Sequence, residues 1–133
     1  MGVEAASFNL AKSSDLIVNP GSTEYVSVAS LGASSAVMCY EDYQAASKSW
    51  KGTCNALTLS GTTLSKGSDL IVNAGSTWYV SVASFGASSA IMCYRDYSNS
   101  GYGTCNAIGC GAGMNPACCT GTLSPNFSPD DRF

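Results

Sequence analysis

The amino-acid sequence predicts an all-β protein built from two four-stranded antiparallel, blade-like sheets. First, residues 10–43 recur as residues 64–97 at an offset of 54 positions, with seven differences and no gap. A repeat of about this length is typical of propellers and related repeat architectures. Second, Ser, Thr, Val, Tyr and Gly dominate each copy and no 3.6-residue apolar period is sustained, which favours strands over helices. Third, turn-forming sequences separate the apolar segments.

Each complete unit is expected to contain four strands. In the first copy they are "EYVSVAS" (24–30), "SAVMCYED" (35–42), "GTCNALTLSG" (52–61) and "TTLSKGSDLIVN" (62–73). In the first of these strands, Val26 and Val28 should point to one face, and Tyr25, Ser27 and Ala29 to the other. After residues 43 and 97 the copies diverge through segments of unequal length and rejoin at "GTCNA", which indicates a variable loop between two strands.

The N-terminal segment "FNLAKSSDLIV" (8–18) has the sequence of a fourth strand, whereas the second copy ends at "GTCNAI" (103–108) without one. Eight strands would make two four-stranded sheets if the N-terminal strand completes the second unit. We therefore expect a pseudo-twofold sandwich with Val, Ile, Leu and Met between the sheets. The alternative is a partial propeller whose open edges are covered by other protein.

The chain divides into a two-repeat β domain and a tail. The β domain spans 1–108, with repeat 1 at 10–63 and repeat 2 at 64–108, and the Cys- and Pro-rich tail spans 109–133. Irregular structure is expected for the tail, because its prolines favour extended backbone.

Seven cysteines and no histidine in 133 residues favour disulfides over a zinc site. Two cysteines flank the variable loop in each copy, so the pairs Cys39–Cys54 and Cys93–Cys105 are expected to face each other across neighbouring strands. The alternative is buried free thiols that pack as small hydrophobic groups. Three more cysteines lie in the tail, where one pair can form a further disulfide: Cys110, Cys118 and Cys119. Disulfides place the protein in an oxidising compartment, either extracellular, secretory or another oxidising lumen.

Composition excludes several classes of function. With 11% charged residues and a net charge of −3, the chain offers no electrostatic footprint for nucleic acid. No apolar run approaches the roughly 20 residues that span a bilayer, so no transmembrane segment is expected. We expect no cofactor, because the sequence has no phosphate-binding glycine loop and no metal-ligand pattern.

Catalysis is not expected. Without histidine, a Ser-His-Asp triad, a Cys-His dyad and a His-ligated metal are excluded. Paired carboxylates remain, but the pairs Asp15 and Asp69, and Asp42 and Asp96, are repeat-equivalents. A role that recurs in every unit indicates a structural carboxylate at a strand end that accepts backbone N–H hydrogen bonds in the following turn.

The segments "YVSVASFGASSAIMCYRDY" (79–97) and "GTCNALTLSGTTLSKGSDLIVNAGST" (52–77), taken together as one unit, resemble tandem repeats of about 50 residues in β-propeller-like proteins of unicellular algae and in some phage tail proteins. The resemblance covers residues 10–108 and implies architecture, because no activity is assigned to these repeats. An algal source would make the thylakoid lumen a suitable oxidising compartment.

Departures from the repeat are the best candidates for function. Glu24 is replaced by Trp78 and Glu41 by Arg95, while the frame is kept. Exposed aromatic rings can anchor a protein interface or stack on a sugar, or simply cap the ends of the sheets. The candidate interface residues are Trp50, Trp78, Tyr97, Tyr102, Arg95, Phe127 and Phe133.

Two hypotheses follow. In the first, the protein is a non-catalytic structural or accessory subunit that docks on other protein subunits of a larger complex, such as the lumenal side of an algal photosynthetic membrane complex. In the second, it is a secreted module that binds carbohydrate through its loop aromatics.

Overall fold

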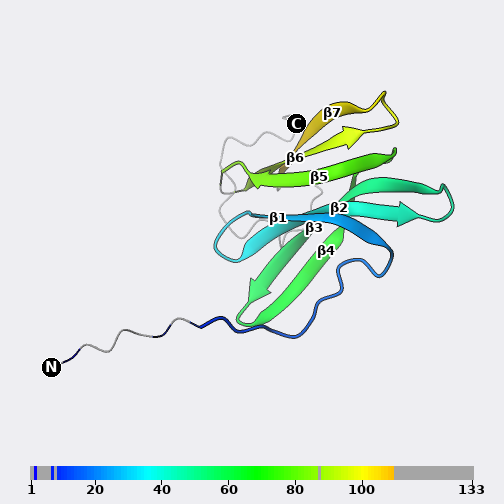
Figure 1. Cartoon of the computed structure of the whole chain (residues 1–133). Helices are drawn as coiled ribbons and strands as arrows, with labels where there is room; N and C mark the ends of the chain where they lie inside the picture. Colours follow the sequence, from blue (N-terminus) through cyan, green and yellow to red (C-terminus); the bar gives the residue numbers. More distant parts are fainter. Residues whose placement is uncertain (1, 3–6, 8, 87, 110–133) are drawn as a thin grey trace.

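A computed structural model describes residues 2, 7, 9–86 and 88–109, and this part of the chain is all-β (Figure 1). It contains seven antiparallel strands in two sheets and no helix. The strands are β1 (Thr23–Ser30), β2 (Ser35–Gln44), β3 (Ser49–Ser60), β4 (Thr63–Asn73), β5 (Thr77–Ser84), β6 (Ser89–Asp96) and β7 (Tyr102–Gly109). The predicted fold class and all seven predicted strands of the repeat region are confirmed.

The first unit forms a four-stranded sheet in the order β1-β2-β3-β4, and the second a three-stranded sheet in the order β5-β6-β7. The prediction of an eighth strand that completes the second sheet is wrong for the described residues, because 9–18 form no strand. This segment instead runs to the first sheet, where Val18 is buried against Tyr40 and Leu57. Lys66 Nζ fixes it there by donating a hydrogen bond of 2.6 Å to the Val18 carbonyl.

Each sheet has two faces, one marked by its disulfide and one by two valines. The disulfide face of the first unit carries Ala29, Leu31, Val37, Cys39 and Cys54. The valine face of the second unit carries Val80, Val82, Ala90, Met92, Tyr94 and Ile108. These two sets form one buried core, so the disulfide face of the first sheet packs on the valine face of the second.

Several equivalent residues of β1 and β5 therefore have opposite environments in the two units. Val82 is 8% exposed and Val28 is 56% exposed, whereas Ala29 is buried and Ala83 is exposed. A twofold arrangement would bury the same face of both units, so the expected pseudo-twofold relation is wrong. The units pack head to tail, with the disulfide face of the first unit against the valine face of the second.

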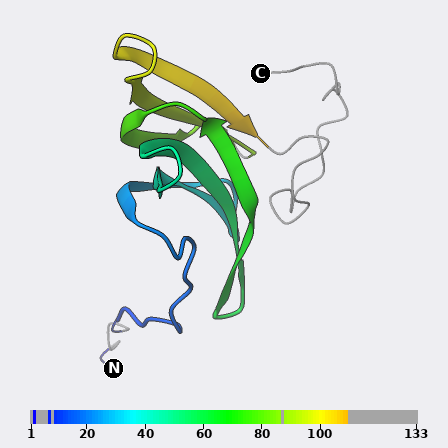
Figure 2. The same ribbon diagram turned by 90° about the vertical axis from the view of Figure 1, so that its right-hand side faces the viewer.

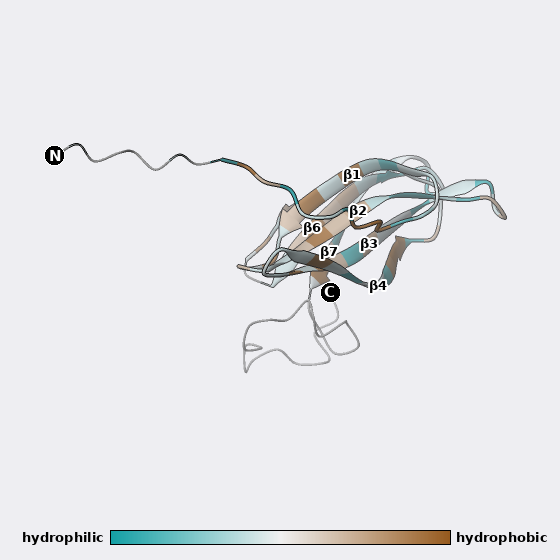
Figure 3. Ribbon diagram, turned by 90° about the horizontal axis from the view of Figure 1, so that it is seen from below, coloured by the Kyte–Doolittle hydropathy of each residue, from teal (hydrophilic) through white to brown (hydrophobic). Residues whose placement is uncertain are grey.

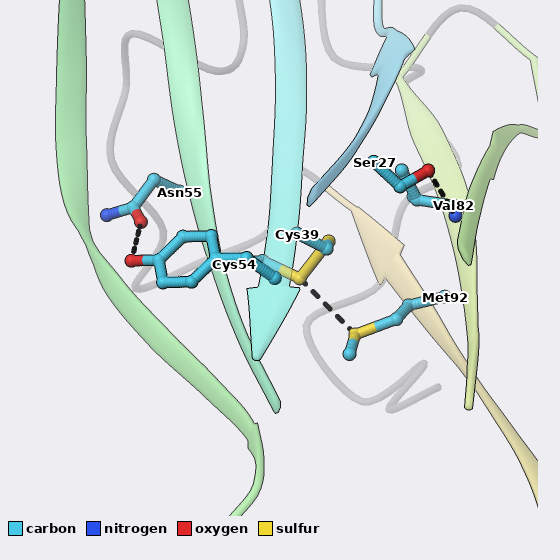
Figure 4. The surroundings of a disulfide bond; sticks show 7 residues. Ser27, Cys39, Cys54, Asn55, Val82 and Met92 are labelled. Atoms are coloured by element: carbon cyan, nitrogen blue, oxygen red, sulfur yellow. Dashed lines mark hydrogen bonds between the residues drawn. A yellow bond between two sulfur atoms is a disulfide. The ribbon is translucent and has the colours of Figure 1, made fainter. Parts of the chain in front are cut away.

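Both predicted disulfides are present. Cys39 pairs with Cys54 and Cys93 with Cys105, each between residues directly opposite on neighbouring strands. The first is fully buried, and Met92 reaches it from the other sheet, with 3.4 Å between Met92 Sδ and Cys54 Sγ (Figure 4). Because neither sulfur carries a hydrogen, this contact is one of polarisable atoms in a packed core. The second disulfide lies on the outer face of the second sheet, where Cys105 is exposed. The other cysteines, Cys110, Cys118 and Cys119, lie outside the described residues.

Identical turns lead into the two units. Asn19 Oδ1 accepts the Gly21 amide at 3.2 Å, and Asn73 Oδ1 accepts the Gly75 amide at the same distance. The Nδ2 groups of the two asparagines donate to the hydroxyls of the threonines that begin β1 and β5. These local hydrogen bonds explain why the N-x-G-S-T sequence makes a turn that leads into β1 and into β5.

Candidate interaction surface

Exposed aromatic rings form a continuous row across the junction of the two units. Tyr25 of β1 contacts Tyr79 of β5 edge to face, with 5.0 Å between ring centroids. Trp78 lies 6.2 Å from Tyr79 and 6.2 Å from Tyr97, and the Arg95 guanidinium lies 5.8 Å from the Tyr97 ring centre. We call these five residues the aromatic strip. All of them are exposed in the described structure.

A bulge in each first strand positions the tyrosines of the strip. Tyr25 has a φ of 48° and Tyr79 a φ of 59°, in the left-handed region that residues other than glycine rarely adopt. The strand register shifts at the same place, between Glu24 and Ser27 and between Trp78 and Ser81. Such a conformation costs about 1–3 kcal/mol and persists where its surroundings fix it. The expected placement of Tyr25 on the face of Ser27 is therefore replaced by an outward position beside the junction.

A buried carboxylate fixes one of these bulges. Glu41 is 1% exposed, and its Oε1 accepts the Tyr79 amide hydrogen at 2.5 Å across the two sheets. Burial raises the pKa of Glu41, the hydrogen bond from Tyr79 lowers it, and the nearby charge of Glu24 raises it further, so the net direction is upward. A second bridge, from the Val82 amide to Ser27 Oγ at 3.0 Å, joins the same two sheets (Figure 4).

Replacing Glu41 with glutamine should increase the free energy of unfolding at neutral pH, since the amide oxygen can still accept the Tyr79 hydrogen without a buried charge. A raised folded-state pKa means that the native protein loses stability as pH rises from the unfolded pKa, about 4.3, through the folded pKa. The loss is about 1.4 kcal/mol per unit of pKa shift. Urea unfolding at several pH values should show the stability gain of the variant growing across this window and levelling above it. Glu24→Gln removes an exposed charge that helps to raise this pKa, and it should give a smaller gain across the same pH window. An E41Q gain that is the same at every pH would contradict the prediction.

The structure brings some of the predicted interface residues together and separates others. Trp78, Tyr97 and Arg95 belong to the aromatic strip, and Arg95 and Tyr97 also line a shallow open depression with Ser100 and Gly101. Trp50 pairs instead with Tyr43 on the first unit, at 5.0 Å between ring centroids.

Other predicted interface residues lie apart from the strip. Tyr102 begins β7 and is exposed, and among the described residues no ring contact joins it to the strip. Phe127 and Phe133 lie outside the described residues. Tyr25 and Tyr79 were not among the sequence candidates, although each directly follows the substituted position Glu24 or Trp78; a tyrosine carries no sequence signal of a bulge.

The repeated aspartates accept hydrogen bonds mostly from side chains, whereas the predicted bonds from the turn backbone are found at Asp96. Asp42 Oδ1 accepts a hydrogen bond from Asn19 at 2.9 Å, and Asp69 accepts one from Asn55 at 2.7 Å. In the second unit, a hydrogen bond from Ser98 Oγ lowers the pKa of Asp96. Asp15 forms an ion pair of 2.9 Å with Lys12, the counterpart of the 3.7 Å pair between Asp69 and Lys66.

Comparison with known proteins gives no guide to function, since no family model, curated protein or solved structure matches this chain. Within the described residues, no group of three or more Cys, Asp or Glu side chains could hold a metal ion. In the same residues, no helix has the length and apolarity needed to cross a membrane. The aromatic strip is therefore the main candidate for a functional surface in the described structure.

Proposed function

We propose that this protein is a non-catalytic structural or accessory subunit that docks on a larger protein assembly through the aromatic strip. The observation that carries the proposal is the continuous row of exposed Tyr, Trp and Arg side chains across the junction of the units. These residue types dominate the energetic centres of protein interfaces, because they bury large areas at a small loss of side-chain entropy.

Rigidity supports this role. The Glu41 hydrogen bond holds the Tyr79 backbone, and the Tyr25 ring packs on the Tyr79 ring. A surface whose rings are already in place loses little conformational entropy when a partner binds. The two disulfides are compatible with an oxidising compartment. The assembly would then lie in the extracellular space, a secretory lumen or a thylakoid lumen, there on the lumenal side of a photosynthetic membrane complex.

The test compares two tyrosines that are almost equally exposed. Tyr97, in the strip, is 61% exposed and Tyr102, outside it, is 62% exposed. A partner purified from native extract of the source cells with the immobilised chain should bind Tyr97→Ala and Trp78→Ala about tenfold or more weakly than wild type. Tyr102→Ala should retain the wild-type dissociation constant within about threefold. Equal affinities of Tyr97→Ala and Tyr102→Ala for the partner would refute docking through the strip.

Carbohydrate binding is the second candidate. The depression lined by Arg95, Tyr97, Ser100 and Gly101 offers one ring face with hydrogen-bonding groups beside it, a combination that suits a sugar. Retention of wild-type protein on a glycan array, lost in Tyr97→Ala and kept in Tyr102→Ala, would support this candidate over protein docking.

A further inference from the structure

Two outer faces of the molecule match the two faces that pack inside it. The first unit leaves the β1 part of its valine face outward, with Val26 at 53% and Val28 at 56% exposed. The second unit leaves its disulfide face outward, with Phe85 at 69% exposed. In the core, a disulfide face of one unit packs on a valine face of the other. The two outward faces are therefore of the same two kinds, valine face and disulfide face, that pack on each other in the core.

The open sheet edge has a matching strand sequence elsewhere in the chain. In the first unit β3 pairs with β4, but among the described strands its counterpart β7 pairs only with β6. The sequence equivalent of β4 is the N-terminal segment "LAKSSDLIVN" (10–19), which matches "LSKGSDLIVN" (64–73). Residues 110–133 contain no such sequence.

The N-terminal segment and β7 lie at opposite ends of the molecule, at the bottom and top of both ribbon views (Figures 1 and 2). Val18 anchors the segment on the valine face of the first unit, beside Tyr40 and Leu57. Figure 3 shows hydrophobic residues in this segment as well as in the strands. It is thus poorly placed to reach β7 of its own chain.

We propose that copies of this chain associate head to tail, with the N-terminal segment of one copy added as a fourth strand to β7 of another. The junction repeats the one between the two units of a single chain. The β3–β4 register pairs Thr53 with Ile71, Cys54 with Leu70 and Asn55 with Asp69. The corresponding pairs between copies are Thr104 with Ile17, Cys105 with Leu16 and Asn106 with Asp15.

The anchoring of Val18 is compatible with this pairing. Its counterpart Val72 lies in β4, at the bulge between the pairs Thr53–Ile71 and Gly52–Asn73, and packs on the core that holds Tyr94 and Ile108. Val18 can stay on Tyr40 and Leu57 while the residues before it pair with another copy.

One polar contact between β3 and β4 has an incomplete counterpart on β7. Asn55 accepts a hydrogen bond from Tyr40 at 2.7 Å and donates from Nδ2 to Asp69 at 2.7 Å. Asn106 accepts the equivalent bond from Tyr94 at 2.8 Å, and within the described residues its Nδ2 has no protein acceptor. In the proposed junction Asp15 of another copy is that acceptor.

The two non-conservative differences between the repeats also meet at this junction. Inside the chain, Glu41 of the first unit contacts the backbone of Tyr79, next to Trp78. Between copies, the corresponding junction brings Arg95 toward Tyr25 and its neighbour Glu24. The substitutions thus place opposite charges where the copies meet, which favours this pairing electrostatically.

Sedimentation velocity of the disulfide-intact chain over a range of concentrations tests the proposal. The wild type should increase in mass with concentration. Asn106→Asp keeps the acceptor for Tyr94 but sets a carboxylate against Asp15, and should weaken association about tenfold or more. Adding Asp15→Asn restores a donor and acceptor pair and should recover association. A wild-type chain that stays monomeric at every concentration overturns the proposal. The same result is expected if residues 110–133 of the same chain cover β7, and in that case too the proposal is wrong.

A second pair of variants tests the added strand. Ser14 and Ile17 are exposed and of opposite parity, so Ser14→Pro/Ile17→Pro removes at least one amide that must face β7. This variant should stay monomeric, and the control Ser14→Thr/Ile17→Val should associate. Circular dichroism should show that both keep the fold. Association that persists unchanged in the proline variant overturns the proposal.

Mixing separates a head-to-tail junction from a symmetric dimer. Asn106→Asp retains an intact donor segment, and Ser14→Pro/Ile17→Pro retains an intact β7. An equimolar mixture should form 1:1 dimers that do not grow further, although each variant alone stays monomeric. A mixture that remains monomeric overturns the proposed direction of assembly.

Discussion

Replacing Met92 with alanine is expected to lower the free energy of unfolding by about 2–5 kcal/mol. Met92 is fully buried between the sheets and its sulfur contacts the buried disulfide. A Cβ built on Gly52 would lie 3.0 Å from Met92 Cε, so the backbone of β3 already approaches this side chain closely. The surroundings have little freedom to fill the space that the shorter side chain leaves.

The repeat supplies the control for this substitution. Met38 is the equivalent residue of the first unit, and it is only half-buried on the outward valine face. Met38→Ala should cost roughly 1 kcal/mol, since less apolar area returns to water and no closed cavity forms. Urea unfolding of the two variants without reductant measures the difference. Equal losses would mean that the two valine faces are buried alike, contrary to the head-to-tail packing.

Removing the buried disulfide should destabilise the protein more than removing the outer one. The bridges close loops of similar size, with sequence separations of 15 and 12. The loss of either constraint should therefore cost about 3 kcal/mol through the entropy of the unfolded chain. Cys39→Ala/Cys54→Ala also removes two sulfurs from the packed core, which adds roughly 1–2 kcal/mol.

The matched variant is Cys93→Ala/Cys105→Ala, in which the lost sulfurs lie on the outward disulfide face. Thermal and urea unfolding at low protein concentration, where copies are kept apart, should rank the wild type first, this variant second and the buried-pair variant last. The reverse order of the two variants would contradict the assignment of the first disulfide face to the core.

Much of the fold could be predicted because the repeat and the strand chemistry are local signals. The alternation of Val26, Ser27, Val28 and Ala29 indicates a strand, and two cysteines on neighbouring strands of a repeat indicate a disulfide. Both predictions are confirmed. Local sequence could not reveal which face of a strand becomes buried, because the copies are nearly identical while their burial is opposite. That choice is made by the packing of one unit on the other.

The candidate surface was predicted in part for the same reason. Trp78 and Arg95 stand out as departures from the repeat, and both lie in the aromatic strip. Tyr25 and Tyr79 are identical in the two copies, so no departure from the repeat marks them as candidates. Their position depends on a bulge with positive φ in each first strand, and a hydrogen bond to Glu41 of the other unit holds the bulge at Tyr79.

Head-to-tail packing also constrains which amino acids the duplicated unit can contain. Many duplicated positions on the two faces, among them Val26 and Val80, Val28 and Val82, and Ala29 and Ala83, must be tolerated in contact with water in one copy and in a dry core in the other. Large apolar side chains would be costly outside, and charges would be costly inside. Serine, alanine and valine are acceptable in both settings, and they make up most of the repeated "YVSVAS" strands. The low share of charged residues, 11%, is thus consistent with faces that are exposed in one unit and buried in the other.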